Sequence, residues 1–157
     1  MKNSEEYLTE QKHRELVDEL DFLRTTRRQE VADNLKEARS LGDLSENAEY
    51  HQAREEQANI EKRIKDLEAI LKNAVLLGKK SSGNGKVDIG AIVTLQKKDE
   101  KNSITYTIVG SQEVDMSQNK ISNSSPLVQA MLGKTKGESF SFKSPRGIQD
   151  YKILDIK

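Results

Sequence analysis

The chain has 157 residues, enough for one ordinary domain or two small ones. Only 34% of the residues are hydrophobic and 33% are charged, a balance that is thin for one compact core and normal for long solvated helices. The absence of cysteine excludes a disulfide framework and thiolate metal sites, and no apolar run approaches the roughly 20 residues of a membrane span.

Charge is distributed unevenly between the two halves of the chain. Residues 1–78 carry 13 basic and 18 acidic side chains, a net charge of −5, whereas residues 79–157 carry 13 and 8, a net charge of +5. This asymmetry predicts two domains. The neutral total argues against a protein that coats nucleic acid through a broad basic surface. Because the N-terminus lacks the apolar segment of a signal peptide, we expect a soluble cytoplasmic protein.

A first helix is predicted from Thr9, a suitable N-cap, to Leu41, after which Gly42 is a natural helix-ending residue. With the usual rise per residue of an α-helix, this helix would be on the order of 50 Å long. Its apolar residues follow the seam of a coiled coil rather than a broad buried face, with one lapse near Arg27. The seam residues are Leu16, Leu20, Leu23, Val31, Leu35 and Ala38.

A second helix is predicted from Ser45 to Ala74, on the order of 45 Å long by the same rise. Its seam residues are Ala53, Gln57, Ile60, Ile64, Leu67 and Leu71. Neither helix contains proline and the connection between them is short. We therefore expect a stiff, straight, antiparallel hairpin whose tip, at residues 42–50, is exposed.

The sequence changes character after Lys79–Lys86, a polar, glycine-rich segment that we interpret as a linker. A short helix is predicted from Ser125 to Leu132, with Pro126 at its first position and Gly133 at its end. Strands are predicted at Ala91–Leu95, Ile104–Val109, Ser139–Phe142 and Tyr151–Ile156.

These elements predict an α+β protein with two domains. Residues 1–78 would form a coiled-coil hairpin, residues 79–86 a linker, and residues 87–157 a small antiparallel sheet with one short helix. No nucleophile–base constellation stands out. The histidines, His13 and His51, belong to no metal-ligand pattern and are interpreted as surface helix residues. The glycines at 83 and 85 lack the Lys-Ser/Thr pair and the strand–helix context of a phosphate loop.

Two carboxylates, Asp43 and Glu46, stand three residues apart in the turn. At the start of a helix, an aspartate N-cap followed by such a glutamate satisfies free backbone N–H groups and suits the positive end of the helix dipole. The spacing alone favours this capping role. The functional alternative is a cation bound in trans. Mg²⁺ is often held by one or two carboxylates, and a partner would have to supply its other ligands.

Arg39 and Arg54 lie on opposite helices, about two turns behind the tip. They are either ordinary surface arginines or a basic spot that grips a phosphate of a nucleic acid. Spacing alone favours ordinary surface arginines.

The segment Glu37–Gln57, with Gly-Asp-Leu-Ser-Glu-Asn-Ala-Glu-Tyr at residues 42–50, closely resembles the signature of the Gre transcript-cleavage factors. Its form is similar to the GreA rather than the GreB type. The resemblance covers nearly the whole chain. Other matching segments are Leu20–Leu23, Arg63–Glu68, Tyr106–Gly110, Ile121–Ser122, Ser125–Leu127 and Leu132–Lys134.

This resemblance implies a coiled-coil hairpin followed by a domain similar to the FKBP fold. It implies a bacterial transcription elongation factor, not itself an enzyme. Its C-terminal domain would dock at the rim of the secondary channel of RNA polymerase, and the hairpin would enter the channel. We expect a monomer with no membrane contact.

For the tip, the resemblance implies that Asp43 and Glu46 help to hold the second Mg²⁺ of the polymerase and orient the water that cleaves RNA in backtracked complexes. Arg39 and Arg54 match positions that contact the RNA 3′ segment. No cofactor would be bound tightly, because the Mg²⁺ is shared with the polymerase active site. Departures from the family pattern at Glu10-Gln11 and at residues 147–150 concern docking rather than the tip.

Three other functions are less consistent with these residues. A Gre-fold inhibitor would occupy the channel without cleaving, which the intact Asp43 and Glu46 disfavour. A peptidyl-prolyl isomerase or chaperone would use an aromatic pocket. The aromatic residues of this domain are instead expected in the core; they are Tyr106, Phe140, Phe142 and Tyr151. A plain coiled-coil scaffold is disfavoured by the interrupted heptads and the sharp turn.

Overall fold

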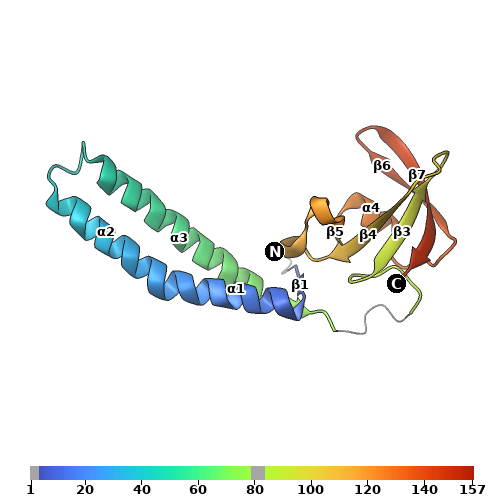
Figure 1. The fold of residues 1–157 in the computed structure, drawn as a ribbon, viewed down its shortest axis with the longest axis horizontal. Helices are drawn as coiled ribbons and strands as arrows, with labels where there is room; N and C mark the ends of the chain where they lie inside the picture. Colours follow the sequence, from blue (N-terminus) through green and yellow to red (C-terminus); the bar gives the residue numbers. More distant parts are fainter. Residues whose placement is uncertain (1–3, 79–83) are drawn as a thin grey trace. The chain divides into compact units, whose positions relative to one another are not determined.

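The structure is a computed structural model that describes residues 4–78 and 84–157, so residues 79–83 of the predicted linker lie outside the described residues. The chain divides into two compact units (Figure 1). The first contains Gln11–Ala74, and the second contains Glu5–Glu10 together with Val75–Lys157. The domain boundaries at residues 78 and 87 stay predictions.

The first unit is a helical hairpin, as predicted. One arm consists of α1 (Glu10–Phe22), the π-helical turn η1 (Leu23–Arg27) and α2 (Arg28–Ser40), and the other arm is α3 (Ala48–Lys72). Nine of the predicted seam residues are buried between the arms: Leu16, Leu20, Val31, Leu35, Ala38, Ala53, Ile60, Ile64 and Leu67. The other three, Leu23, Gln57 and Leu71, are half-buried.

The lapse in the seam near Arg27 coincides with the π-helical turn. A heptad repeat continued from Leu23 would reach Glu30, whereas the buried seam residue is Val31, one position later. The turn absorbs the extra residue because its backbone bond runs from the N–H of Arg28 to the carbonyl of Leu23, five residues back. The first arm is therefore not the single straight α-helix predicted, and Figure 1 shows it bending between α1 and α2.

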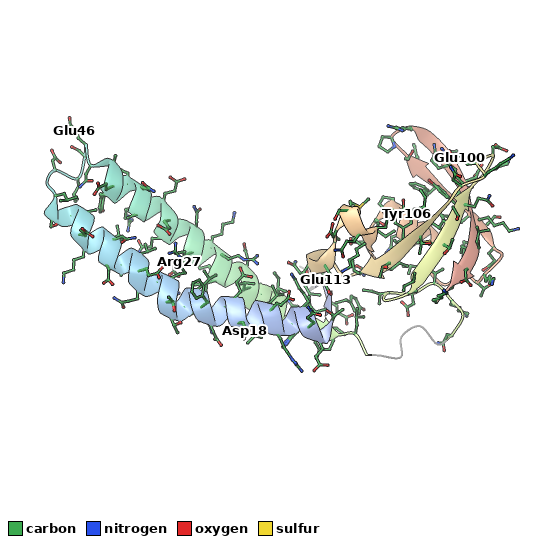
Figure 2. The ribbon with its side chains drawn as sticks, in the orientation of Figure 1. Asp18, Arg27, Glu46, Glu100, Tyr106 and Glu113 are labelled. Atoms are coloured by element: carbon green, nitrogen blue, oxygen red, sulfur yellow. The ribbon has the colours of Figure 1, made fainter. Side chains whose placement is uncertain are left out.

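Ion pairs join the two arms outside the seam. Arg28 binds Glu61 through two bonds of 2.7 Å, and Arg63 binds Glu19 through bonds of 2.7 and 2.9 Å. Two further cross-arm pairs are Arg24–Glu68 and Arg27–Glu56, with Arg27 labelled in Figure 2. Surface pairs of this kind are each worth about 1 kcal/mol or less, so the apolar seam rather than the charges supplies most of the stability of the hairpin.

The second unit is built around a five-stranded sheet with strand order β5-β4-β3-β7-β6. Its strands are β3 (Ile92–Lys97), β4 (Ser103–Val109), β5 (Lys120–Ser122), β6 (Ser139–Ser144) and β7 (Gly147–Ile156). All neighbours pair antiparallel except β4 and β5, which are parallel. The short strand β5 is absent from the sequence prediction, and the four predicted strands are present.

One α-helix, α4 (Pro126–Met131), packs on this sheet. Its N-cap is Ser125, whose side chain accepts a bond from the N–H of Val128. Two 3₁₀ turns, η2 (Ser111–Glu113) and η3 (Met116–Gln118), precede β5. This arrangement confirms the predicted sheet with one short helix.

A second, two-stranded sheet pairs β1 (Glu6–Leu8) with β2 (Ala74–Leu76), neither of which the sequence predicts. In the second unit, β1 lies against Gly110. A Cβ on this glycine would stand 1.9 Å from the carbonyl oxygen of Tyr7. Close by, the backbone N–H and hydroxyl of Thr9 donate to the carboxylate of Glu113 at 3.0 and 2.8 Å. Residues 6–9 are thus held within the second unit by Gly110 and Glu113.

Candidate functional site at the turn of the hairpin

The turn that joins the arms consists of residues 41–47. Helix α2 ends at Ser40, and the backbone N–H of Leu41 donates to the carbonyl of Ala38. Gly42 follows with φ +131°, a conformation that residues with side chains rarely adopt, so glycine ends this helix as predicted. Two apolar residues of the turn, Leu41 and Leu44, are 63% and 40% exposed. Every residue from 41 to 46 is exposed, which makes the turn accessible to a partner.

Asn47, not Asp43, caps the second arm. Its side-chain Oδ1 accepts a bond of 3.0 Å from the N–H of Tyr50, and α3 begins at Ala48. Its Nδ2 donates a bond of 2.7 Å to the carbonyl of Ala38 on the other arm. The predicted helix start at Ser45 and the predicted cap at Asp43 are therefore wrong. Asparagine is a preferred N-cap residue, but so are the aspartate at 43 and the serine at 45, so residue type alone does not single out Asn47.

Asp43 is bound instead within the turn. Its Oδ1 accepts bonds from the backbone N–H and the hydroxyl of Ser45, both at 3.0 Å. This local turn geometry is typical of aspartate, and the two donors hold the pKa of the Asp43 carboxyl below its ordinary value. Among the described residues, the other oxygen, Oδ2, has no hydrogen-bond partner. One oxygen of a stably charged carboxylate is therefore left for a ligand.

Glu46 lies at the end of the hairpin (Figure 2). In the described part of the chain no hydrogen bond or ion pair involves its carboxylate. The carboxylate is therefore available to bind a partner. No group of three or more acidic, histidine or cysteine side chains that could hold a metal occurs over residues 4–78 and 84–157. The two carboxylates suit a hard cation such as Mg²⁺, but further ligands would have to come from another molecule.

The two predicted arginines line one groove near the turn, with a volume of about 350 Å³. Arg54 donates a bond of 3.0 Å to the side chain of Gln57, and the Arg39 guanidinium lies 5.9 Å from the ring centroid of Tyr50, a cation–π contact. Lys36, which the sequence reasoning missed, adds a third positive charge. The groove also includes Ala32 and Leu35.

A second groove on the hairpin, of about 250 Å³, has the opposite charge. Its lining contains the carboxylates of Glu37, Glu49 and Glu56, the last of which is paired with Arg27, and no basic residue. Phosphate groups would be repelled there and attracted to the groove of Arg39 and Arg54. The two grooves near the turn of the hairpin therefore differ in the sign of their charge.

The two histidines lie on the helices of the hairpin, and the aromatic residues of the second unit pack in or against its core. His51 is exposed, with Nε2 3.3 Å from the carbonyl oxygen of Ser45, whereas His13 is half-buried. In the second unit, Phe140 is buried and stacks on Tyr151, with ring centroids 5.8 Å apart. Tyr106, Phe142 and Tyr151 pack against the same core, as expected from the sequence. No described helix is long and apolar enough to cross a membrane.

Comparison with known proteins gives matches over both units. A family model described as "Transcription elongation factor, N-terminal" matches residues 6–76, and one described as "Transcription elongation factor, GreA/GreB, C-term" matches residues 82–157. The chain is 46% identical over 151 residues to transcription elongation factor GreA of Chloroherpeton thalassium, covering 96% of each sequence. It is 45% identical over 150 residues to the GreA of Caldanaerobacter subterraneus subsp. tengcongensis, also covering 96% of each.

Solved structures give related matches. GreA factor homolog 1 of Thermus thermophilus is 29% identical, with a TM-score of 0.46, over 98% of this chain and 99% of that one. A GreA/GreB elongation factor from Nitrosomonas europaea is 25% identical, with a TM-score of 0.43, over 60% of this chain and 78% of that one.

Proposed function

Because the chain belongs to the GreA/GreB family of transcription elongation factors, we propose that it stimulates the endonucleolytic cleavage of RNA by bacterial RNA polymerase in backtracked complexes. The hairpin would reach the active site through the secondary channel, in the cytoplasm, while the second unit docks at the channel rim. The protein would be an accessory factor, since the polymerase itself carries out hydrolysis. The observation that carries this proposal is the exposed turn with its two available carboxylates.

In this mechanism Asp43 and Glu46 supply part of the ligand set of a metal that the factor does not hold alone. A Mg²⁺ shared with the polymerase would activate water and stabilise the charge that develops on the RNA phosphate. Asp43 is suited to this role because Ser45 keeps the carboxylate charged and occupies only one of its oxygens. Glu46 is suited because its carboxylate is exposed and has no described partner.

The positive groove would bind the displaced 3′ segment of the RNA. Guanidinium groups form strong paired hydrogen bonds with phosphate, and Arg39 and Arg54 line the same groove from opposite arms. The acidic groove would disfavour the same RNA on the other side, so the charge pattern selects one path for the strand past the turn.

A transcript-cleavage assay tests the proposal. Wild-type protein is mixed with a stalled, backtracked bacterial complex in Mg²⁺, and the RNA is resolved by length. We expect shortened RNA with the wild type and a rate lower by about 100-fold or more with Asp43→Asn or Glu46→Gln, comparable to the loss of one preorganised group that stabilises a transition state. Binding to the polymerase, measured by competition with labelled wild type, should change little.

Glu55→Gln is the matched control, because Glu55 is an exposed carboxylate of α3 outside the turn. It should cleave at the wild-type rate. Unchanged cleavage by both turn variants would overturn the metal-binding role of the turn. Tight binding by the wild type without any shortened RNA would instead identify an inhibitor that occupies the channel.

A further inference from the structure

One side chain of the turn bonds to both arms of the hairpin. The amide of Asn47 donates through Nδ2 to the carbonyl of Ala38, at 2.7 Å, and accepts through Oδ1 from the N–H of Tyr50, at 3.0 Å. The first partner is a carbonyl in the last turn of α2, and the second is an N–H in the first turn of α3. Both groups lie in the terminal turns, where backbone groups lack the regular intrahelical partner, so a single amide bonds to one backbone group at each helix end.

The residue that Asn47 binds on the first arm, Ala38, is a buried residue of the seam. Ala38 is only 3% exposed, and its carbonyl oxygen accepts bonds from both Leu41 and Asn47. The end of α2 and the beginning of α3 are therefore tied to the same atom. Within residues 41–47, Asn47 is also the one position that is not exposed.

Few described hydrogen bonds other than those of Asn47 hold the segment between Ala38 and Asn47. Its hydrogen bonds besides those of Asn47 are the N–H of Leu41 to Ala38, the pair from Ser45 to Asp43, and the contact of His51 with the Ser45 carbonyl. A loop with so few bonds loses conformational entropy when it is ordered by a partner. A clamp at its ends reduces this loss by limiting the arrangements open to the loop before binding.

We propose that Asn47 is a positioning residue for transcript cleavage: its amide clamps Ala38 to Tyr50 and so presents the neighbouring Glu46, together with Asp43, in a defined arrangement. This inference rests on the proposed function. Asn47 does not touch the metal or the RNA. It acts by fixing the turn from which the two carboxylates project, and a small displacement of such ligands lowers the rate of the chemical step.

The decisive variant is Asn47→Asp. Aspartate is as good an N-cap as asparagine, so the bond from Tyr50 and the start of α3 are retained. A carboxylate has no N–H, so the bond to the carbonyl of Ala38 is lost and a negative charge faces that oxygen. The matched control is Asn59→Asp. It makes the same chemical change at an exposed position of α3 that has no described hydrogen bond.

Two measurements are made on the full-length variants. Amide hydrogen exchange should become faster at residues 41–46 in Asn47→Asp and stay at wild-type rates in the buried part of both arms. In the cleavage assay with polymerase, the rate at saturating factor should fall about 10- to 100-fold, the range typical when the groups that orient metal ligands are lost. The factor concentration at half-saturation should change less than about threefold. A merely structural role would instead speed exchange along the arms and raise that concentration.

The possible outcomes separate the two proposals. Wild-type cleavage with an equal rate for Asn47→Asp overturns the positioning role and leaves the proposed function standing. Absence of cleavage by the wild type overturns the proposed function, and with it the inference. A rate loss of the same size in Asn59→Asp also overturns the positioning role, because added charge rather than the lost bond would then explain the effect.

Discussion

Ser45 donates two hydrogen bonds to a single carboxylate oxygen of Asp43, from its backbone N–H and from its hydroxyl, each 3.0 Å long. Both bonds favour the charged carboxylate, and together they hold its pKa below the ordinary value. Because both reach Oδ1, they stabilise the charge without covering Oδ2. Ser45 therefore controls the protonation of a group that it leaves open to a ligand.

Replacement of Ser45 by alanine should raise the pKa of the Asp43 carboxyl toward its ordinary value, without restoring it fully. The hydroxyl donor is lost, whereas the backbone donor stays. Titration of the Asp43 carboxyl carbon by NMR would measure this shift. Ser45→Thr keeps a hydroxyl and serves as the control, with a pKa close to that of the wild type. Equal titration curves for wild type and Ser45→Ala would show that the hydroxyl bond contributes nothing.

The assignment of the cap shows where sequence reasoning reaches its limit. Asp43, Ser45 and Asn47 are all good N-cap residues, and each stands at the start of a helical pattern. What selects Asn47 is a bond to Ala38, a residue of the other arm. A choice among local candidates that depends on a tertiary contact cannot be read from local spacing.

The seam itself could be predicted almost completely, because burial of one helical stripe imposes a period on the sequence. The lapse of the apolar seam near Arg27 is also visible in the sequence, but such an interruption is compatible with a bend, a break or an inserted residue. The strands β1 and β5 have three residues each, too few for a period to appear. Their partners are set by contacts between distant parts of the chain.

The π-helical turn can be tested by deletion. Removing Thr26, an exposed residue of η1, should restore an unbroken heptad from Leu23 to Val31 and convert the first arm to continuous α-helix. We expect a free energy of unfolding equal to or above that of the wild type, measured with urea and followed by circular dichroism.

Deletion of Ala32 is the matched control, because it removes an exposed residue of α2 beyond the π-helical turn. It would rotate Leu35 and Ala38 out of the seam. The loss should be about 2–5 kcal/mol, the range for removing one large apolar side chain from a core. Equal losses from both deletions would contradict the view that η1 only absorbs an extra residue.

The close approach of Gly110 to β1 predicts a steric effect. In Gly110→Ala the added Cβ would stand 1.9 Å from the carbonyl oxygen of Tyr7, so β1 has to move. The free energy of unfolding should fall by about 1–3 kcal/mol, as for other overpacked sites. Residues 6–8 should also become accessible to limited proteolysis. Gly78→Ala is the control, because a Cβ there meets no atom within 4 Å. Equal stability of the two variants would contradict the steric argument.

The bidentate pairs between the arms predict how the hairpin responds to acid. Hydrogen bonds from Arg63 hold the pKa of Glu19 below its ordinary value, and those from Arg28 do the same for Glu61. A carboxyl whose pKa is lower in the folded than in the unfolded state stabilises the fold fully above the unfolded pKa. That stabilisation is lost as the pH falls through the folded pKa.

The free energy of unfolding should therefore decline as the pH falls below about 4. The double variant Glu19→Gln, Glu61→Gln should be slightly less stable at pH 7, by about 1 kcal/mol or less per pair, and should lose part of this decline because amides do not titrate. Urea unfolding of both proteins at several pH values measures the slopes. Glu55→Gln removes an exposed carboxylate outside any ion pair of the described residues, and its slope should match the wild type. If the double variant kept the full acid decline, other carboxyl groups would have to carry the pH dependence.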